Sequence, residues 1–141
     1  MFNLFVRPEA IQDLAAIKKA SAMDHARVLV LLQEIYADRT LLSQLAEDGV
    51  SDLNTFKIDV TAFGAMQRLH FDMWRIKSYE CGKNYPMPYR LIYAVDNVKM
   101  DYHIFAIMKR NEGTDYENDP ELVARIRNVY LQLGLPFAEK R

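Results

Sequence analysis

Cationic and phenolic side chains gather between residues 74 and 116, and they are the residues best suited to chemistry. The candidate set is Arg75, Lys77, Arg90, Lys109, Arg110 and Tyr116. Guanidinium groups bind phosphate oxygens in pairs and stay charged at any relevant pH, so Arg90 and Arg110 are candidates to bind phosphate. For the same reason neither arginine suits the role of a general base. Lys77 or Tyr116 could take part in proton transfer.

Strand periodicity determines which of these side chains can meet. Residues 73–79 alternate between apolar and polar, and this period of two places Arg75 and Lys77 on one face of a strand. Residues 89–95 and 102–109 are dense in β-branched and aromatic residues, which predicts the next two strands. Because neighbouring strands lie about 4.8 Å apart, cations on these three strands can lie close together.

Ordinary surface ion pairing explains the same charges. The cations could pair at strand edges with nearby acids, namely Glu80, Asp96, Asp101 or Asp115. Exposed pairs of this kind are common and contribute little to stability. Spacing alone favours this alternative over a binding site.

One strand and two helices are predicted before residue 50. Residues 2–6 form a short apolar run, and Pro8 suits the first turn of a helix that continues to about Ala20. Asp24 is predicted to cap a second helix, which either bends near Asp38 or continues to residue 49. Its predicted buried stripe is Val28, Leu31, Leu32 and Ile35. Two helices joined by a short turn indicate a hairpin packed on a sheet.

The rest of the chain completes an α+β prediction. Residues 50–72 are predicted to form an irregular connection, although residues 56–60 alternate like a strand. Asp119 followed by Pro120 is a strong helix start, and Gly134 predicts its end. The predicted fold has an N-terminal strand and a helical hairpin packed on a small, mostly antiparallel sheet of about four strands, with a C-terminal helix.

Composition bounds the class of protein. The chain has 141 residues, of which half are apolar and about a quarter are charged, as in an ordinary globular domain. The formal net charge of −1 gives no general argument for nucleic-acid binding. We see no apolar run long enough to cross a membrane and no signal-peptide pattern, and Cys81 is the single cysteine. These features favour the cytoplasm.

Metal and cofactor sites are not predicted. His25, His70, His103 and Cys81 occur at no recognised ligand spacing. The sequence has no glycine-rich phosphate loop and no nucleophile motif of the hydrolases.

Four short motifs, in order, resemble the RelE/ParE superfamily of toxins from bacterial toxin–antitoxin modules. They are WRIK, YRLIYAV, IFAIMKR and a tyrosine that follows six residues after Arg110. The helical hairpin before these motifs and the helix after them are also similar to that family. The resemblance implies a single RelE-like toxin domain over residues 1–141, with an insertion at about 50–72.

The resemblance also implies a function. RelE-like members are ribosome-dependent endoribonucleases, or mRNA interferases, that inhibit translation by cutting messenger RNA. In them the 2′-hydroxyl attacks the adjacent phosphate, so no metal or cofactor is needed. ParE-like members instead inhibit DNA gyrase. An inactive member that only binds a partner or regulates transcription is a third alternative.

Roles for individual residues follow from the matched motifs. Arg90 would bind the scissile phosphate, Arg110 would stabilise developing charge, and Tyr116 would stack on or orient the nucleotide. Lys77 matches one of a pair of lysines that lie two residues apart in RelE, which implies a catalytic role for it, and Arg75 stands where the other lysine is found. Arg75 and Lys109 are predicted to bind the substrate. The implied partners are a cognate antitoxin protein, which would form a toxin–antitoxin hetero-oligomer, and the ribosome with its messenger RNA, with no membrane involved.

Overall fold

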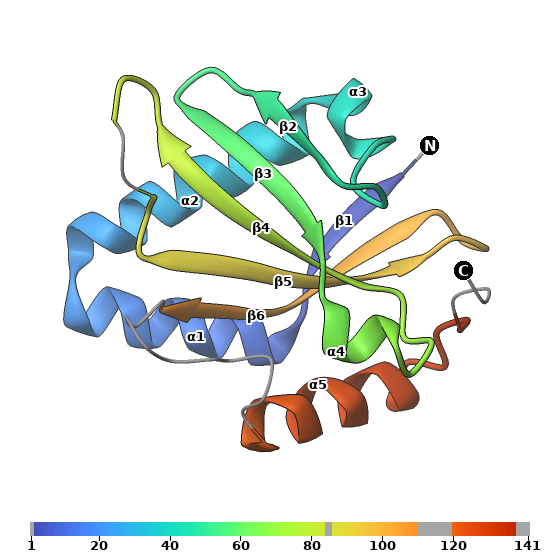
Figure 1. Ribbon diagram of the computed structural model, residues 1–141. Coiled ribbons are helices and arrows are strands. Elements are labelled where there is room, and N and C mark those ends of the chain that lie inside the picture. The colour runs from blue at the N-terminus through green and yellow to red at the C-terminus, as the bar shows by residue number, and fades with distance from the viewer. Residues whose placement is uncertain (1, 84–85, 110–119, 138–141) are drawn as a thin grey trace.

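The computed structural model describes residues 2–83, 86–109 and 120–137 (Figure 1). The elements follow in the order β1 (Asn3–Val6), α1 (Pro8–Ala20), α2 (Ala22–Ala37), α3 (Arg39–Leu42), β2 (Gly49–Asp52), β3 (Phe56–Ala62), α4 (Gly64–Gln67), β4 (Met73–Glu80), β5 (Tyr89–Asp96), β6 (Asp101–Lys109) and α5 (Pro120–Gln132). The predicted α+β class is confirmed.

Six strands form one mixed sheet within the described residues, in the order β1-β6-β5-β4-β3-β2. β1 is parallel to β6, and every other neighbouring pair is antiparallel. The expectation of about four strands was wrong, because residues predicted as an irregular connection contain β3 and much of β2. β2 has only four residues, GVSD, which is too short to show a period of two. Its pairing with β3 could therefore not be recognised from sequence.

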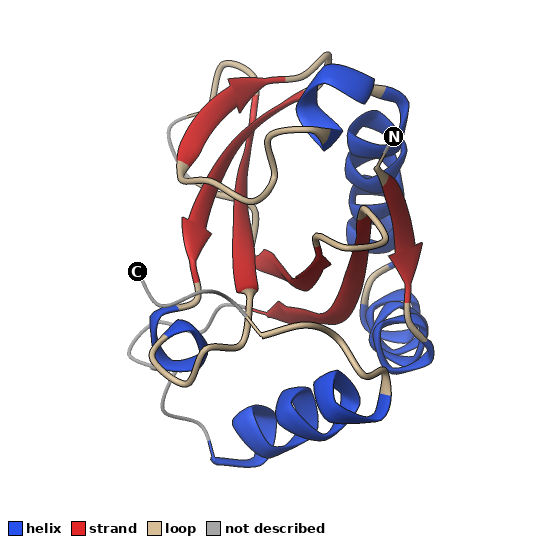
Figure 2. Ribbon diagram, turned by 90° about the vertical axis from the view of Figure 1, so that its right-hand side faces the viewer, coloured by secondary structure: helices blue, strands red, loops and turns tan. Residues whose placement is uncertain are grey.

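Helices cover the two faces of the sheet unequally (Figures 1 and 2). The hairpin of α1 and α2, together with α3, packs on one face through a core that includes Leu31, Ile35 and Leu91. α4 and α5 pack on the opposite face, where Ile126 and Phe105 belong to a second core. Figure 1 shows that no described helix lies in front of β2, β3 and the later part of β4. That part of the sheet is open on the side facing the viewer.

Local chemistry explains most helix boundaries. Pro8 is the first residue of α1, as predicted, and Gly134 adopts a positive φ of 63° just after α5. The predicted cap of α2 was wrong: Ser21 caps the helix by accepting a hydrogen bond from the Asp24 N–H. Asp38 ends α2 and caps α3, so of the two alternatives left open by the sequence the structure shows the bend near Asp38. Asp119, the predicted cap of α5, lies outside the described residues.

Two side chains seal the edge of β6 beyond its partner strand. The ladder between β1 and β6 ends at Val6 and Ile104. Further along, the Ile107 N–H donates to the Asp13 carboxylate at 2.9 Å, and Arg125 donates to the Phe105 carbonyl at 3.0 Å. Arg125 and Asp13 also form an ion pair at 3.0 Å. This pair therefore joins α1, α5 and the edge of β6.

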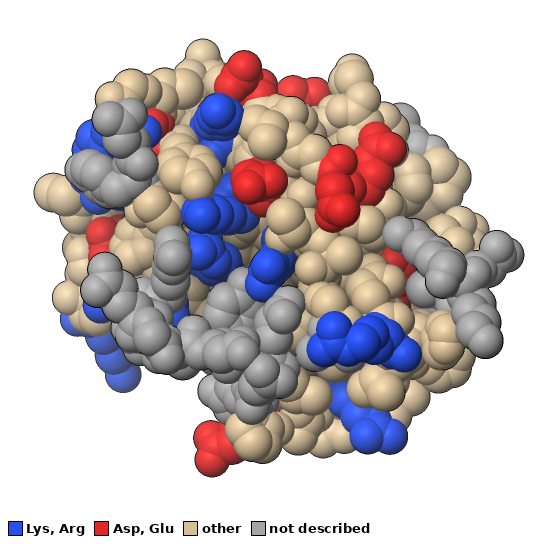
Figure 3. Space-filling model, in the orientation of Figure 1, with Lys and Arg blue, Asp and Glu red and all other residues tan. Residues whose placement is uncertain are grey.

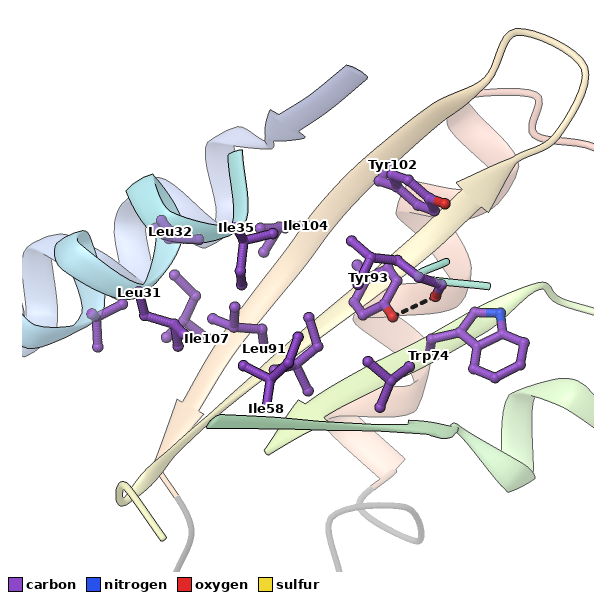
Figure 4. Packing of buried hydrophobic residues seen from close by; sticks show 14 of the residues in the cluster. Leu31, Leu32, Ile35, Ile58, Trp74, Leu91, Tyr93, Tyr102, Ile104 and Ile107 are labelled. Carbon is purple, nitrogen blue, oxygen red and sulfur yellow. Dashed lines mark hydrogen bonds between the residues drawn. The ribbon is translucent and has the colours of Figure 1, made fainter. Parts of the chain in front are cut away.

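Two buried tyrosines lie in the core between the sheet and the helical hairpin (Figure 4). The Tyr93 hydroxyl donates to the Leu45 carbonyl at 2.6 Å, and the Tyr93 and Tyr102 rings meet edge to face at 6.0 Å between centroids. Burial, first of all, raises the pKa of Tyr93 well above its usual range and raises the pKa of Tyr102 to about 12.

We predict that Asp13→Ala and Arg125→Ala each lower the free energy of unfolding by about 1–3 kcal/mol, because each removes hydrogen bonds to a charged group. The double variant should lose less than the sum of the two single variants, since the residues act as a pair. Urea unfolding measures all three, with Lys18→Ala on the exposed side of α1 as the control. Strict additivity would show that the pair does not act as one unit.

Stability should also fall at high pH. The folded state keeps the phenolic protons of Tyr93 and Tyr102 after the unfolded chain begins to release them near the ordinary pKa of 10.0. Their contribution is therefore complete below that pH and is lost as the pH rises toward about 12. Urea unfolding between about pH 8 and about pH 11 should show this decline, and Tyr102→Phe should make it shallower. An equal decline in the variant would assign the effect to other groups.

Candidate phosphate-binding site

Four cations lie on the face of the sheet opposite the helical hairpin. We call Lys57 on β3, Arg75 and Lys77 on β4, and Arg90 on β5 the basic face. Their sequence neighbours, among them Trp74, Ile76, Tyr89 and Leu91, belong to the core under the helical hairpin, so alternation turns the cations the other way. Figure 3 shows Lys and Arg side chains gathered over the middle strands on this side. The structure thus brings three of the predicted site residues onto one face.

Strand register places these residues next to one another. Arg75 pairs with Ile92, and the last paired residues between β4 and β5 are Ile76 and Leu91. Lys77 and Arg90 are the next residue on each strand. Neighbouring strands are about 4.8 Å apart, so the two cations lie within reach of one ligand.

Side-chain contacts orient two of the cations. The Arg75 Nε donates to the Thr61 Oγ1 at 2.7 Å, across the register pair that these residues form on β3 and β4. The Lys77 ammonium lies 5.4 Å from the centroid of the Tyr79 ring. Arg90 is buried, with 7% of its surface exposed, while Arg75 and Lys77 are partly exposed. The cluster is therefore held by the sheet and open to solvent on its β4 side.

The acids expected to neutralise these cations contact other groups. Glu80 forms ion pairs with Arg27 and Lys83, each at 3.0 Å. Asp96 accepts backbone N–H groups within its own turn, and Asp101 accepts a hydrogen bond from Asn3. Asp115 lies outside the described residues. Asp59, which pairs in register with Lys77, is the carboxylate that borders the basic face on β3.

The remaining predicted residues are not brought to this cluster. Lys109 is exposed at the end of β6 and pairs with Tyr89. Because Ile107 points into the core under the helical hairpin, alternation turns Lys109 to that same side, away from Arg90. Arg110 and Tyr116 lie outside the described residues.

The β2–β3 hairpin supplies residues that the sequence analysis did not single out. Lys57, Asp59 and Thr61 share one face of β3, beside the cations of β4. The alternation of residues 56–60 was the signal that could have placed them there. These residues were not predicted as part of the site because the pairing of β3 with β4 was not recognised from the sequence.

A hollow elsewhere on the molecule shares no residue with the basic face. It has a volume of about 730 Å³ and lies between the end of α2, the start of α3 and the turn that joins β2 to β3. Glu34 in its wall accepts backbone N–H groups of that turn from Thr55 and Phe56. The Glu34 carboxylate thus stabilises the turn between β2 and β3. The candidate site therefore lies on the basic face and not in this hollow.

Comparisons with protein-family models, with curated proteins and with solved structures each returned no match to this chain. Among the described residues, no helix is long and apolar enough to span a membrane. The function is therefore argued from the residues of the site.

If the basic face binds a phosphate backbone, salt should weaken the binding in proportion to the cations involved. The logarithm of the binding constant for single-stranded RNA falls by about 0.7 per neutralised phosphate for each unit of the logarithm of salt concentration. Arg75→Gln and Lys77→Gln should each weaken binding and reduce this slope by about 0.7. Fluorescence anisotropy of a labelled RNA oligonucleotide measures both quantities.

Lys18→Gln is the matched control, because Lys18 is an exposed lysine of α1, which covers the face of the sheet opposite the basic face. It should leave the slope unchanged. Equal slopes in all four proteins would place the RNA away from the basic face.

Proposed function

We propose that this protein is the toxin of a toxin–antitoxin module, a RelE-like, metal-independent and ribosome-dependent endoribonuclease that cuts messenger RNA. The observation that carries the proposal is the clustering of Arg75, Lys77 and Arg90 on one face of the adjacent strands β4 and β5. The cluster has the residue types that bind a phosphodiester and is partly exposed to solvent.

The order of elements supports the same proposal. A strand and a helical hairpin precede three consecutive antiparallel strands, and a helix follows them. This is the arrangement that the resemblance to RelE-like toxins implies. The β2–β3 hairpin then stands as an addition at the outer edge of β4.

The chemistry needs only groups of the protein and the RNA. The 2′-oxygen forms a bond to the neighbouring phosphorus, and the bond from phosphorus to the 5′-oxygen breaks. The products are a cyclic phosphate end and a 5′-hydroxyl end. In this proposal Lys77, in its uncharged amine form, accepts the proton of the 2′-hydroxyl, and a proton from water completes the 5′-hydroxyl of the leaving group. Arg90 binds the phosphate as negative charge develops on it.

Two further roles come from the resemblance alone. Arg110 would add charge stabilisation, and Tyr116 would stack on the nucleotide or orient it. The proposed partners are a cognate antitoxin and the ribosome. In this proposal a local cluster of cations binds the RNA, although the formal net charge of the chain is −1, because salt screens the charges that lie farther away.

We predict that controlled expression in a bacterium stops growth and produces 5′-hydroxyl ends within translated messages. Lys77→Ala should lower cleavage by about a hundredfold or more, as loss of a general base does. Arg90→Lys keeps the charge but loses the planar donors, and it should lower cleavage by about a hundredfold. Mapping of RNA ends measures both effects.

Lys18→Ala serves as the control and should cleave like the parent protein. Circular dichroism of each variant separates loss of activity from loss of folding. Intact messages together with altered DNA supercoiling would contradict the nuclease proposal and support a gyrase inhibitor instead. Unchanged growth with intact messages would leave only a binding function.

A further inference from the structure

The β2–β3 hairpin forms a hollow directly beside the basic face. The hollow has a volume of about 560 Å³. Its walls are Val50, Asp52, Lys57, Asp59, Tyr79, Glu80, Cys81, Gly82 and Lys83. Lys57 belongs to the basic face, and Asp59 pairs in register with Lys77, so the hollow and the basic face share a border.

Strand pairing brings three kinds of chemistry together in this hollow. Lys57 pairs with Tyr79 on one side and with Asp52 on the other. The partly exposed Tyr79 ring carries the Lys77 ammonium 5.4 Å from its centroid. An aromatic ring, cations and three carboxylates therefore line one small volume. Figure 3 shows acidic side chains beside the gathered cations on this face.

These groups define the chemistry of a ligand. A ring such as that of Tyr79 offers a flat surface on which a base can stack. Carboxylates accept hydrogen bonds from exocyclic amino groups, as Asp and Glu do from cytosine. Cations at the border attract the phosphate that joins one nucleotide to the next. A base that carries an amino group satisfies all three, whereas uracil turns a carbonyl oxygen toward the carboxylates.

Glu80 and Lys83 contribute less to this selection. They pair with each other, and Glu80 also pairs with Arg27 of α2. Asp52 and Asp59 are thus the acids that we assign to the ligand.

We propose that this hollow is a nucleotide subsite that selects an amino-bearing base, namely cytosine, adenine or guanine, over uracil, next to the phosphate bound by the basic face. The proposal rests on the proposed function in that it places an RNA strand on this face. It gives the β2–β3 hairpin a task in choosing the sequence that is cut.

The test compares cytidine 5′-monophosphate with uridine 5′-monophosphate by titration into the ¹⁵N-labelled protein. The two nucleotides share sugar and phosphate, so their difference reports the base alone. The cytidine nucleotide should shift the backbone amide signals of Lys57 and Tyr79, and the uridine nucleotide should bind about five- to tenfold more weakly. Inorganic phosphate should shift the amide signals of the basic face. At saturation it should shift the Tyr79 signal less than the cytidine nucleotide does.

Two variants separate stacking from amino-group recognition. Tyr79→Leu keeps an apolar side chain without the ring and should weaken both nucleotides. Asp59→Asn is nearly isosteric and should bring the affinity for the cytidine nucleotide down to that for the uridine nucleotide. The spectra themselves report whether each variant is folded.

Equal affinities for the two nucleotides would overturn the subsite, as would shifts confined to Arg75 and Lys77. Neither result depends on cleavage of RNA. If the protein selects the cytidine nucleotide but cuts no message, the subsite proposal is supported and the nuclease proposal is contradicted. If the protein cuts messages but binds the two nucleotides equally, the proposed function is supported and the subsite proposal is contradicted.

Discussion

Burial of β5 on both faces is the constraint on which the rest of the structure depends. All eight of its residues are buried, with Leu91 and Tyr93 under the helical hairpin and Ile92 and Ala94 under α4 and α5. A charged side chain on such a strand costs free energy unless it lies where polar groups or solvent can reach it. Arg90 stands at the start of the strand, next to the open part of the sheet. The same burial that builds the core therefore confines this cation to the site.

The β2–β3 hairpin changes what β4 can do. Without it β4 would be an edge strand, whose unpaired backbone groups invite association with other chains. Pairing with β3 satisfies those groups and sets Thr61 and Asp59 beside Arg75 and Lys77. The same pairing builds one wall of the hollow at Tyr79. Pairing of the β4 edge and formation of the candidate binding surface thus come from one local event, the closing of a hairpin.

Elements whose signals are local could be predicted from the sequence. Pro8 and Gly134 mark helix ends because their own backbone restrictions determine them, and β5 and β6 are dense in strand-forming residues. Features set by pairing could not be predicted. β2 carries no pattern of its own, and the side of the sheet on which Lys109 lies depends on register near the bulge between β5 and β6. Arg75 and Lys77 were predicted to share a face because their alternation is visible in the sequence, whereas Arg90 was grouped with them only because its strand was expected to lie nearby and because its motif matches the resemblance.

The proposed RNA binding on the open face depends on two interactions of different range, namely electrostatic attraction and short-range contacts. Under the proposed function, attraction between the basic face and phosphate would be electrostatic, so salt would screen it over about 8–10 Å, and it would carry no information about the base. In the proposed subsite, stacking on Tyr79 and hydrogen bonds to Asp52 and Asp59 would act at contact and would depend on the base. A chain with a net charge of −1 gains little long-range attraction for nucleic acid, so under the proposed function contacts at short range must supply more of the affinity for RNA. That balance favours a protein delivered to RNA by another assembly, such as the ribosome, over one that finds RNA by charge alone.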